Sequence, residues 1–314
     1  MHLSKKIKLI IVICFISILN TQNLSALENK ILFKVDNEII TTIDIHEEIK
    51  FLKAFNPEIS SLGDEKLFEI SKNSLIRDKI KKIELMKYVK ELKVNDKFLQ
   101  NLIKGKFSRL NIDSIKDFEQ YLKNKELNIE NIKEKFTIEL MWNDLIYQKF
   151  SNKVIIDKDK IKNEISQSSK KKLQKELLLS EIIFNVVNKD DFDDKYYKIL
   201  SDIKKIGFKK AALIHSNSDT ASNGGLIGWI KEDNLNQSLK KIVSKLKPGQ
   251  FSKPIRTSSG FIIIQVEDEK EYVSKFNLED KINEVTRFKR DEQLNQFSSM
   301  YLNKLKKNLI IYGL

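Results

Sequence analysis

The chain reads Asn223-Gly224-Gly225-Leu226-Ile227-Gly228-Trp229, a stretch in which three glycines stand among large apolar residues. Glycine lacks a Cβ atom and therefore adopts backbone conformations that are closed to other residues. The stretch follows a segment of small and polar residues from Ala211 to Ser222. Together they predict a glycine-bearing loop after a helix, which we expect over residues 190–206.

Two turn signals and a strand follow this loop. The first turn lies in Leu246-Lys247-Pro248-Gly249-Gln250-Phe251-Ser252-Lys253-Pro254-Ile255, where the Pro-Gly pair predicts a turn after a helix. Ser259-Gly260 then leads into Phe261-Ile262-Ile263-Ile264-Gln265-Val266, which strongly favours a strand. Upstream, the compact apolar run from Leu177 to Phe184 is suited to a buried strand. These signals predict a small β-containing module.

This series of residues resembles the parvulin-type peptidyl-prolyl cis-trans isomerase domain, also called the PpiC or rotamase domain. The hallmarks of that family are Gly-Gly-x-Leu-Gly-Trp, a helix, Gly-x-x-Ser-x-Pro, and Ser-Gly before the last strand. The match covers residues 177–268 and has no gap from Gly225 to Ile264. The resemblance implies a small antiparallel sheet flanked by helices, with a groove for extended peptides.

The resemblance also implies where an isomerase site would lie. Active parvulins place two histidines on adjacent strands, with a Cys or Asp on the loop between them. In this chain the two histidine positions fall on Glu181 and Ile262, and the Cys or Asp position falls on Ser218. Glu181, Ser218 and the neighbouring Asp219 are therefore the candidate catalytic residues, and we expect isomerase activity that is weak or lost.

The apolar wall of the family site is better preserved. Ile227, Leu235 and Leu239 fall where the family lines its proline pocket, with Ser259 nearby. The family usually carries Met and Phe at the positions of Leu235 and Leu239. Together with Ile262, these residues are the expected substrate-binding set.

Two polar residues of the module leave alternatives open. His215 is the module's only histidine, and a lone histidine in a loop is more often a surface residue than a catalytic one. We therefore expect His215 at the surface, with a compensating catalytic role as the alternative. Glu181 begins an apolar strand, so we expect it either at the strand edge or bonded to the loop near Ser218.

The residues before the module have helical patterns. Two short strands with a turn at Asp36-Asn37 precede a helix that Thr42 caps and Asn56-Pro57 ends. Apolar residues then recur every three to five positions from Lys66 to Leu92, which predicts one long amphipathic helix. Shorter helices are expected over residues 95–110, 114–126, 128–150 and 157–165.

The residues after the module return to a helical pattern. Residues 276–307 form a long, one-sided apolar pattern, and residues 309–312 favour a terminal strand. A helix of this kind cannot bury its apolar stripe alone. We therefore expect it to pack back on the N-terminal helices, which would make the module an insertion in a helical domain.

The N-terminus has the order of a secretory signal peptide: a basic start, an apolar run from Leu9 to Leu19, and Ala26 at the cleavage point. The run is shorter than the about 20 residues that cross a bilayer. We expect cleavage and no membrane anchor afterwards. A retained anchor is the alternative, because Leu24 is unfavourable two residues before the cleavage point.

Composition limits the remaining classes of function. The formal net charge is +13, and lysines alternate with acidic residues as on solvated helix faces, so we expect no nucleic-acid partner. The chain has 1 cysteine, Cys14 in the leader, and 3 histidines, so we expect no internal disulfide, metal or other cofactor. It has no Gly-x-x-x-x-Gly-Lys loop, which predicts ATP-independent binding.

The flanking segments extend the resemblance. The stretch from Val35 to Thr41 ahead of helices, the single module and the closing helix with its strand are similar to the SurA family of periplasmic chaperones. The expected fold is α+β: a helical N-terminal domain completed by a C-terminal helix, with one inserted parvulin-like module. The expected divisions are a signal peptide, the helical domain, the module, and the closing helix and strand: 1–26, 27–173, 174–268 and 269–314.

The resemblance implies a function as well. We expect a periplasmic, ATP-independent chaperone for unfolded outer-membrane proteins and other exported chains. An active prolyl isomerase acting on exported proteins is one alternative, and a membrane-anchored periplasmic foldase is another.

Overall fold

The computed structural model of the protein describes residues 29–107, 112–168, 173–186, 191–258, 260–273 and 277–313. The expected signal peptide at 1–26, with Cys14, and the expected binding residue Ser259 lie outside these ranges. Within them, no helix is both long and apolar enough to cross a membrane.

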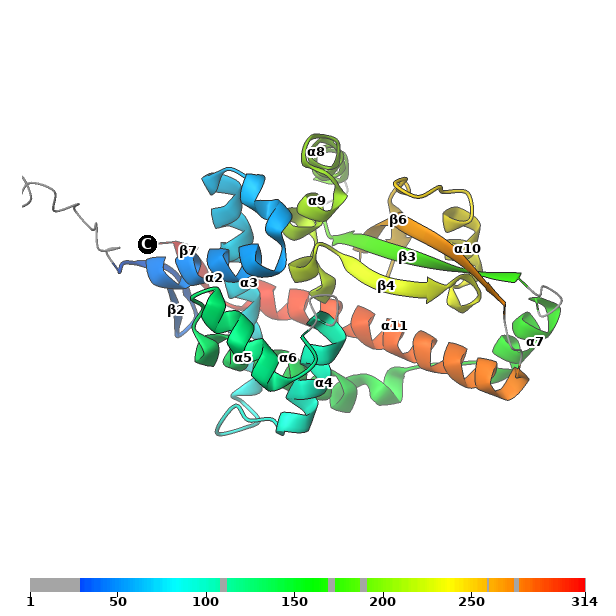
Figure 1. Ribbon diagram of the computed structural model, residues 1–314, viewed down its shortest axis with the longest axis horizontal. Helices are drawn as coiled ribbons and strands as arrows, with labels where there is room; N and C mark the ends of the chain where they lie inside the picture. Colours follow the sequence, from blue (N-terminus) through cyan, green and yellow to red (C-terminus); the bar gives the residue numbers. More distant parts are fainter. Residues whose placement is uncertain are drawn as a thin grey trace, which may run out of the picture.

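The chain first builds a hairpin and a group of helices, which we call the helical domain. Helix α7 then leads away from it toward the module (Figure 1). The elements are β1 (Ile31–Val35), β2 (Glu38–Thr41), α2 (Thr42–Phe55), η1 (Pro57–Ser61), α3 (Asp64–Leu85), α4 (Asp96–Phe107), α5 (Ile115–Asn124), α6 (Ile129–Phe150), η3 (Ser151–Lys153) and α7 (Lys158–Ser168).

The module follows, and a long helix and a short strand close the chain. In the module, strands alternate with short helices, as the family resemblance implies. The elements are β3 (Leu173–Phe184), α8 (Asp191–Ile206), α9 (Phe208–His215), η4 (Asp219–Asn223), β4 (Leu226–Lys231), η5 (Glu232–Asn234), α10 (Gln237–Val243), β5 (Ile255–Thr257), β6 (Gly260–Val273), α11 (Leu278–Asn308) and β7 (Ile311–Gly313).

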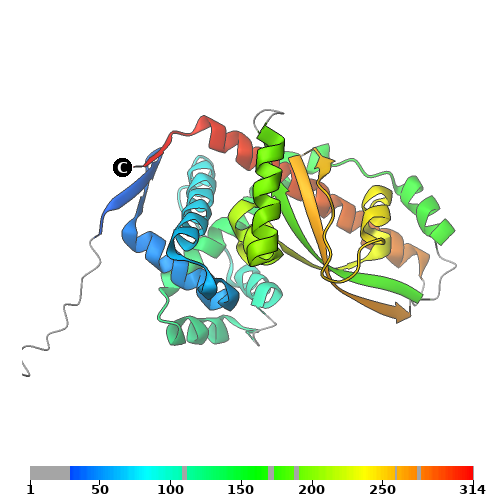
Figure 2. The ribbon, with the colours of Figure 1, turned by 90° about the horizontal axis from the view of Figure 1, so that it is seen from above.

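Two antiparallel sheets organise the structure. The module sheet has the order β4-β3-β6-β5, and its long central pair runs from Leu173↔Val273 to Phe184↔Phe261 with one register shift between Leu178 and Leu179. The second sheet has the order β2-β1-β7, with Lys34 opposite Tyr312. The last strand therefore pairs with the first, and both lie at the same end of the molecule (Figure 2).

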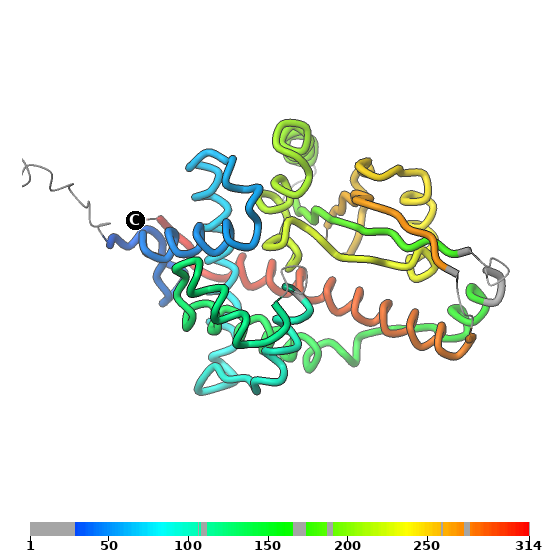
Figure 3. Tube along the Cα trace, in the orientation of Figure 1, coloured from blue at the N-terminus to red at the C-terminus, as the bar shows by residue number. Residues whose placement is uncertain are grey.

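Helix α11 connects the two ends of the molecule. It runs back from the far side of the module to the helical domain (Figures 1 and 3). There the fully buried Trp142 of α6 donates a hydrogen bond to Ser298 Oγ at 2.8 Å, and Leu302 joins the core of β1, α3 and α6. The expected α+β fold, with a closing helix on the helical domain and an inserted module, is confirmed.

The expected helix over 66–92 is wrong at its end, because α3 stops at Leu85. The buried Glu84 accepts hydrogen bonds from Lys87, Tyr88 and, across the core, Tyr301. These bonds hold residues 87–88 in a turn. Beyond Leu85 the apolar positions are no longer buried in the core: Met86 is exposed, and Val89 and Leu92 are partly buried. The periodicity in the sequence therefore continues past the end of the helix.

Two smaller expectations are also corrected. The cap of α2 is Thr41 rather than Thr42: its hydroxyl accepts from Asp44 N, while the Asp44 carboxylate accepts from Thr41 N. This reciprocal capping box satisfies two backbone donors at once. The segment from Ala211 to His215 belongs to α9 and not to a loop, because Gly207, at φ +88°, reverses the chain after α8.

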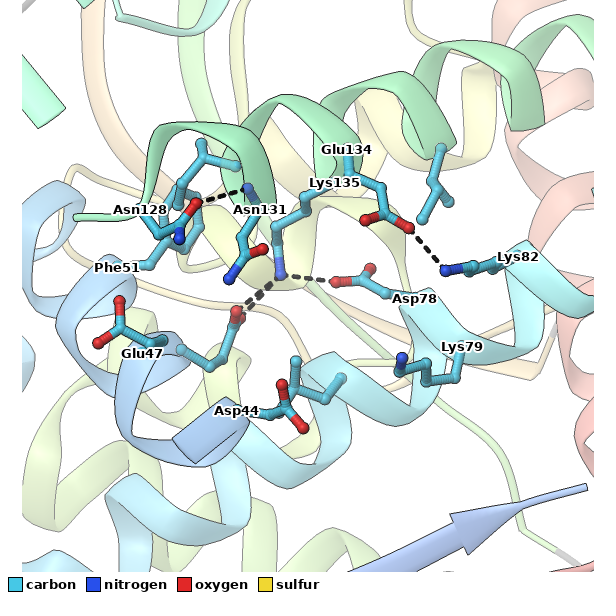
Figure 4. A pocket seen from close by; sticks show the side chains of 14 residues that line it. Asp44, Glu47, Phe51, Asp78, Lys79, Lys82, Asn128, Asn131, Glu134 and Lys135 are labelled. Carbon is cyan, nitrogen blue, oxygen red and sulfur yellow. Dashed lines mark hydrogen bonds and ion pairs between the residues drawn. The ribbon is translucent and has the colours of Figure 1, made fainter. Parts of the chain in front are cut away.

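A cluster of paired charges joins three helices of the helical domain (Figure 4). Lys135 of α6 donates to both oxygens of Glu48 on α2 at 2.9 Å and to Asp78 on α3 at 2.6 Å. Burial alone would lower the pKa of Lys135, but the two carboxylates hold it above its ordinary value. The neighbouring charges are paired as well: Lys82–Glu134, Lys79–Glu38 and Lys50–Glu47. We interpret this small pocket as a structural ion cluster.

Replacing Lys135 tests this interpretation. In the Lys135→Ala variant, Glu48 and Asp78 would be left without their cation, and we expect the free energy of unfolding to fall by about 3 kcal/mol. Urea unfolding followed by circular dichroism measures this. Lys133→Ala on the same helix removes a more exposed pair with Glu119 and should cost less than about 1 kcal/mol. Equal losses in the two variants would contradict a special role for the cluster.

Candidate functional site

A cleft of about 680 Å³ lies between the module sheet and α11. Strands β3, β4, β5 and β6 and helix α10 line one side, and α11 with part of α7 lines the other. The predicted site residues within the described ranges all line this cleft: Glu181, Ser218, Asp219, Ile227, Leu235, Leu239 and Ile262. Their grouping is a fact of the structure, whereas their catalytic and binding roles stay predictions.

A glycine fixes Glu181 beside the loop that precedes β4. Gly225 has φ +80°, and a Cβ atom on it would lie 2.2 Å from the carbonyl oxygen of Glu181. The Glu181 N–H donates to the Gly225 carbonyl at 2.8 Å. Only glycine permits so close an approach at this backbone angle. The Gly-Gly pair of the sequence motif therefore positions Glu181, the residue at the first histidine position of the family, against the loop.

Three hydroxyl groups, which we call the hydroxyl chain, connect the loop to the Glu181 carboxylate. Thr220 Oγ1 donates to Glu181 Oε1 at 2.9 Å, Ser218 Oγ lies 2.5 Å from Thr220 Oγ1, and Ser216 Oγ lies 3.1 Å from Ser218 Oγ. The Ile183 N–H donates to Ser216 Oγ at 3.0 Å. Each hydroxyl group has one proton to donate. Because Thr220 donates to Glu181, it accepts from Ser218, and Ser218 accepts from Ser216, so every donor in the chain points toward the carboxylate. Glu181 is thus bonded to the loop, through Thr220, which the sequence did not single out.

The Glu181 carboxyl is unusually easy to protonate. Burial raises its pKa to about 7, and the charges of Asp219 and Glu292 act in the same direction. The hydroxyl groups of Thr220 and, behind it, Ser218 oppose the rise. At neutral pH the group is therefore divided between acid and carboxylate, and it can hold or release a proton in the cleft.

Asp219 has different partners from those of Glu181. Its carboxylate accepts from Lys81 Nζ of α3 at 2.6 Å and from Ser298 Oγ of α11 at 3.1 Å. Burial alone would raise the pKa of Asp219, but Lys81 and the nearby Arg77 hold it below its ordinary value. Asp219 is therefore an ionised group that joins the module, the helical domain and α11, at one end of the cleft.

The expected surface position of His215 is wrong. His215 ends helix α9, is only 5% exposed, and places Nε2 2.8 Å from Asp202 of α8. Burial lowers its pKa, although the bond to Asp202 opposes this, so the imidazole is neutral at pH 7. His215 is not among the residues that line the cleft. It stabilises the contact between two helices of the module.

The floor of the cleft is apolar, and α11 contributes to it. Leu235 is buried, Ile227 is 38% exposed, and Phe288 of α11 packs on the cluster that contains Leu235, Leu239 and Ile262. Sequence reasoning missed Phe288, because it lies outside the family motif and appears only as one apolar position of a long helix. The one available signal was the one-sided pattern of residues 276–307, which gives no indication of which module surface it would face.

The chemistry that this arrangement can offer is limited. The described residues lining the cleft include neither histidine nor cysteine. In the ranges that the structure describes, no group of three or more His, Cys, Asp or Glu side chains is arranged to hold a metal ion. The cleft can hold an apolar side chain against its floor, and the Glu181 carboxyl, Ser218 and Thr220 line it beside that floor.

Residues 182–268 match the family model described as "Rotamase: PPIC-type PPIASE domain". The chain is 24% identical over 202 residues to the chaperone SurA of Hahella chejuensis. The aligned residues make up 62% of this chain and 46% of that one. It is 28% identical over 262 residues to the foldase protein PrsA of Clostridium botulinum, covering 78% and 76% of the two chains. The chain spans about half the length of the SurA relatives it matches. The predicted resemblance to SurA-like chaperones with a parvulin-type module is confirmed.

Solved structures give a similar picture at low similarity. One, from work on two SurA-like chaperones of Campylobacter jejuni, matches 91% of this chain and 99% of its own, with 22% identity and a TM-score of 0.36. PrsA of Bacillus anthracis matches 74% and 94%, with 19% identity and a TM-score of 0.31. Scores of this size support no conclusion about domain arrangement or function, so the assignment of the module rests on the family model.

The raised pKa of Glu181 predicts a pH-dependent stability. The folded pKa of about 7 lies above the ordinary 4.5, so the folded state binds more protons between these values. Stability should therefore fall as the pH rises from 5 to 8, by up to about 1.4 kcal/mol per pH unit. Glu181→Gln should remove the part of this slope that Glu181 contributes, leaving the smaller part from Glu292, and should be more stable than the wild type at pH 8. Urea unfolding at several pH values measures it.

The control for this experiment is Glu176→Gln. Glu176 lies on the same strand and pairs with the half-exposed Lys270. This variant should keep the wild-type slope. A slope that is as steep in Glu181→Gln as in the wild type would show that other groups cause it.

Removing Lys81 tests the junction at Asp219. Lys81→Ala would leave the partly buried Asp219 carboxylate with only the more distant charge of Arg77, and we expect a loss of about 2 kcal/mol in the free energy of unfolding. Proteolysis within residues 216–225 should also become faster, because the loop loses its anchor. Lys82→Ala, which removes the more exposed pair with Glu134, is the matched control and should change neither measurement appreciably.

Proposed function

We propose that this protein is an exported, ATP-independent chaperone that holds extended segments of unfolded proteins, and that its parvulin-type module has weak or lost isomerase activity. The observation that carries the proposal is the make-up of the cleft. It has an apolar floor and a hydroxyl chain, but Glu181 and Ile262 occupy the positions where active parvulins carry histidines. Such a cleft retains groups that bind a peptide and lacks the imidazoles.

The expected loss of activity follows from what isomerisation requires. The barrier to rotation about an X–Pro bond is about 20 kcal/mol, and an enzyme must bind the twisted amide more strongly than the planar one. Ile262 offers no hydrogen bond to a twisted amide. Glu181, Ser218 and Asp219 are the remaining polar groups, and Asp219 is already paired with Lys81. This supports residual activity at most.

The binding role is assigned to the apolar side of the cleft. We propose that Ile227, Leu235, Leu239 and Ile262 hold proline or other apolar residues of a client. The proposed clients are unfolded outer-membrane proteins in the periplasm. The leader-like sequence of residues 1–26 supports export, and the similarity to chaperones named SurA supports the client class. The proposed divisions are 1–26, 27–173, 174–268 and 269–314.

Two alternatives each have a supporting observation. An active prolyl isomerase is supported by the family match and by a Glu181 pKa near neutrality, because such a group can exchange a proton with a substrate amide. A membrane-anchored foldase is supported by the similarity to PrsA over 78% of the chain and by the apolar run from Leu9 to Leu19.

Two assays run side by side separate these functions. Residues 27–314 should suppress the aggregation of an unfolded outer-membrane protein, while isomerisation of a short proline peptide stays near its uncatalysed rate. Ile227→Asp, at the partly exposed floor, should weaken suppression. Ile155→Asp, at a site that is 83% exposed and outside the cleft lining, should not. Clear isomerisation would favour the active enzyme, and an intact N-terminus on the protein isolated from cells would favour the anchored foldase.

A further inference from the structure

Helix α11 presents a row of four residues, each four positions after the last, toward the module. Three of them contact it directly. Glu284 accepts from Lys231 at 2.8 Å and from Asn234 at 2.9 Å, Phe288 packs on the apolar floor, and Gln296 accepts from Ser258 at 2.9 Å. The fourth, Glu292, lines the cleft between Phe288 and Gln296. The row therefore holds α11 on the module at three points and leaves one carboxylate facing the cavity.

Glu292 shares the lining of the cleft with a second carboxylate, Glu181. Neither forms an ion pair with a basic side chain in the part of the chain that the structure describes. The cation whose charge acts on the pKa of Glu292 is Lys289, and its Nζ lies 3.4 Å from a carboxylate oxygen of Glu164. Burial raises the pKa of Glu292, as it does that of Glu181, and the charge of Glu292 raises the pKa of Glu181 further. The two groups repel one another across a cavity that has room for a side chain.

A positively charged side chain would remove this repulsion. The other basic residues that line the cleft do not supply one, since Lys160 and Arg256 are exposed to solvent. Phe288 and Glu292 are one turn apart on α11, which is about 6 Å along the helix axis. An extended peptide advances about 3.3 Å per residue, so it covers that distance in two residues.

We propose that the cleft selects extended segments in which a Lys or Arg lies two residues from a proline or another apolar residue. The apolar residue would lie on the floor against Phe288, and the cation would lie between Glu181 and Glu292. This inference rests on the proposed function, because it assumes that the cleft binds peptides, and it names the class of segment that is bound.

Three blocked, dye-labelled peptides test the inference. They share one sequence around a central proline and carry Lys, norleucine or Glu two residues away on both sides, so that either strand direction is served. Binding is measured by fluorescence anisotropy at pH 8, above the pKa of about 7 of Glu181. The wild type should bind the Lys peptide about tenfold more tightly than the norleucine peptide, and the Glu peptide most weakly.

Two variants assign the preference to Glu292. Glu292→Gln should lose most of the preference for Lys and keep its affinity for norleucine. Glu269→Gln, at an exposed site outside the cleft lining, makes the same change of net charge and should keep the preference. Circular dichroism confirms that both variants are folded.

The outcomes separate the two levels of the proposal. Equal affinity of the wild type for the Lys and norleucine peptides would overturn the inference. So would a preference for the Lys peptide that is as large in Glu292→Gln as in the wild type. In either case, measurable binding of the norleucine peptide would leave the proposed function standing. No binding of any peptide would overturn the proposed function and the inference with it.

Discussion

The ion pair between Lys81 and Asp219 joins three parts of this protein that are far apart in the sequence. Lys81 belongs to α3, Asp219 to the loop of the module, and the carboxylate also accepts from Ser298 of α11. Trp142 of α6 donates in turn to Ser298, and Lys81 lies 5.6 Å from its ring centroid. Lys81 is buried in this pair, and a buried cation is favourable only when its partners are in place. The position of the module therefore depends on the helical domain and on α11 together.

The second wall of the cleft is a consequence of this junction. Ser298 fixes α11 at the loop end of the module, and Glu284 fixes it near β4 and η5, through Lys231 and Asn234. The helix between these points cannot turn, so the face with Phe288 and Glu292 must lie over the sheet. The pairing of β7 with β1 closes the helical domain after α11. The cleft therefore forms only because α11 runs back to the helical domain, and the module alone would not have it.

Local signals in the sequence were sufficient for the module and for the order of the helices. The Gly224-Gly225 pair was informative because a Cβ atom at Gly225 would collide with Glu181, so the motif reflects a real contact. The early end of α3 and the burial of His215 could not be predicted, since each depends on partners elsewhere in the fold, Tyr301 and Asp202. Glu292 was missed for the same reason. The role of a single acidic residue in an amphipathic helix can be inferred only when the residues opposite it in the fold are known.

The same geometry makes the two parts of the proposed function, peptide binding and slow isomerisation, compatible in one cleft. Catalysis of rotation requires tighter binding of the twisted amide than of the planar one. A cleft with the sheet on one side and α11 on the other would contact a bound extended segment from both sides, so under the proposed function both contacts would favour the ground state. The hydroxyl chain ends at Glu181, so its donors are directed to that carboxylate and not to a substrate amide. When a site stabilises the planar ground state as much as the twisted transition state, it binds the peptide more tightly without speeding its isomerisation. This is what the proposed holding of clients requires.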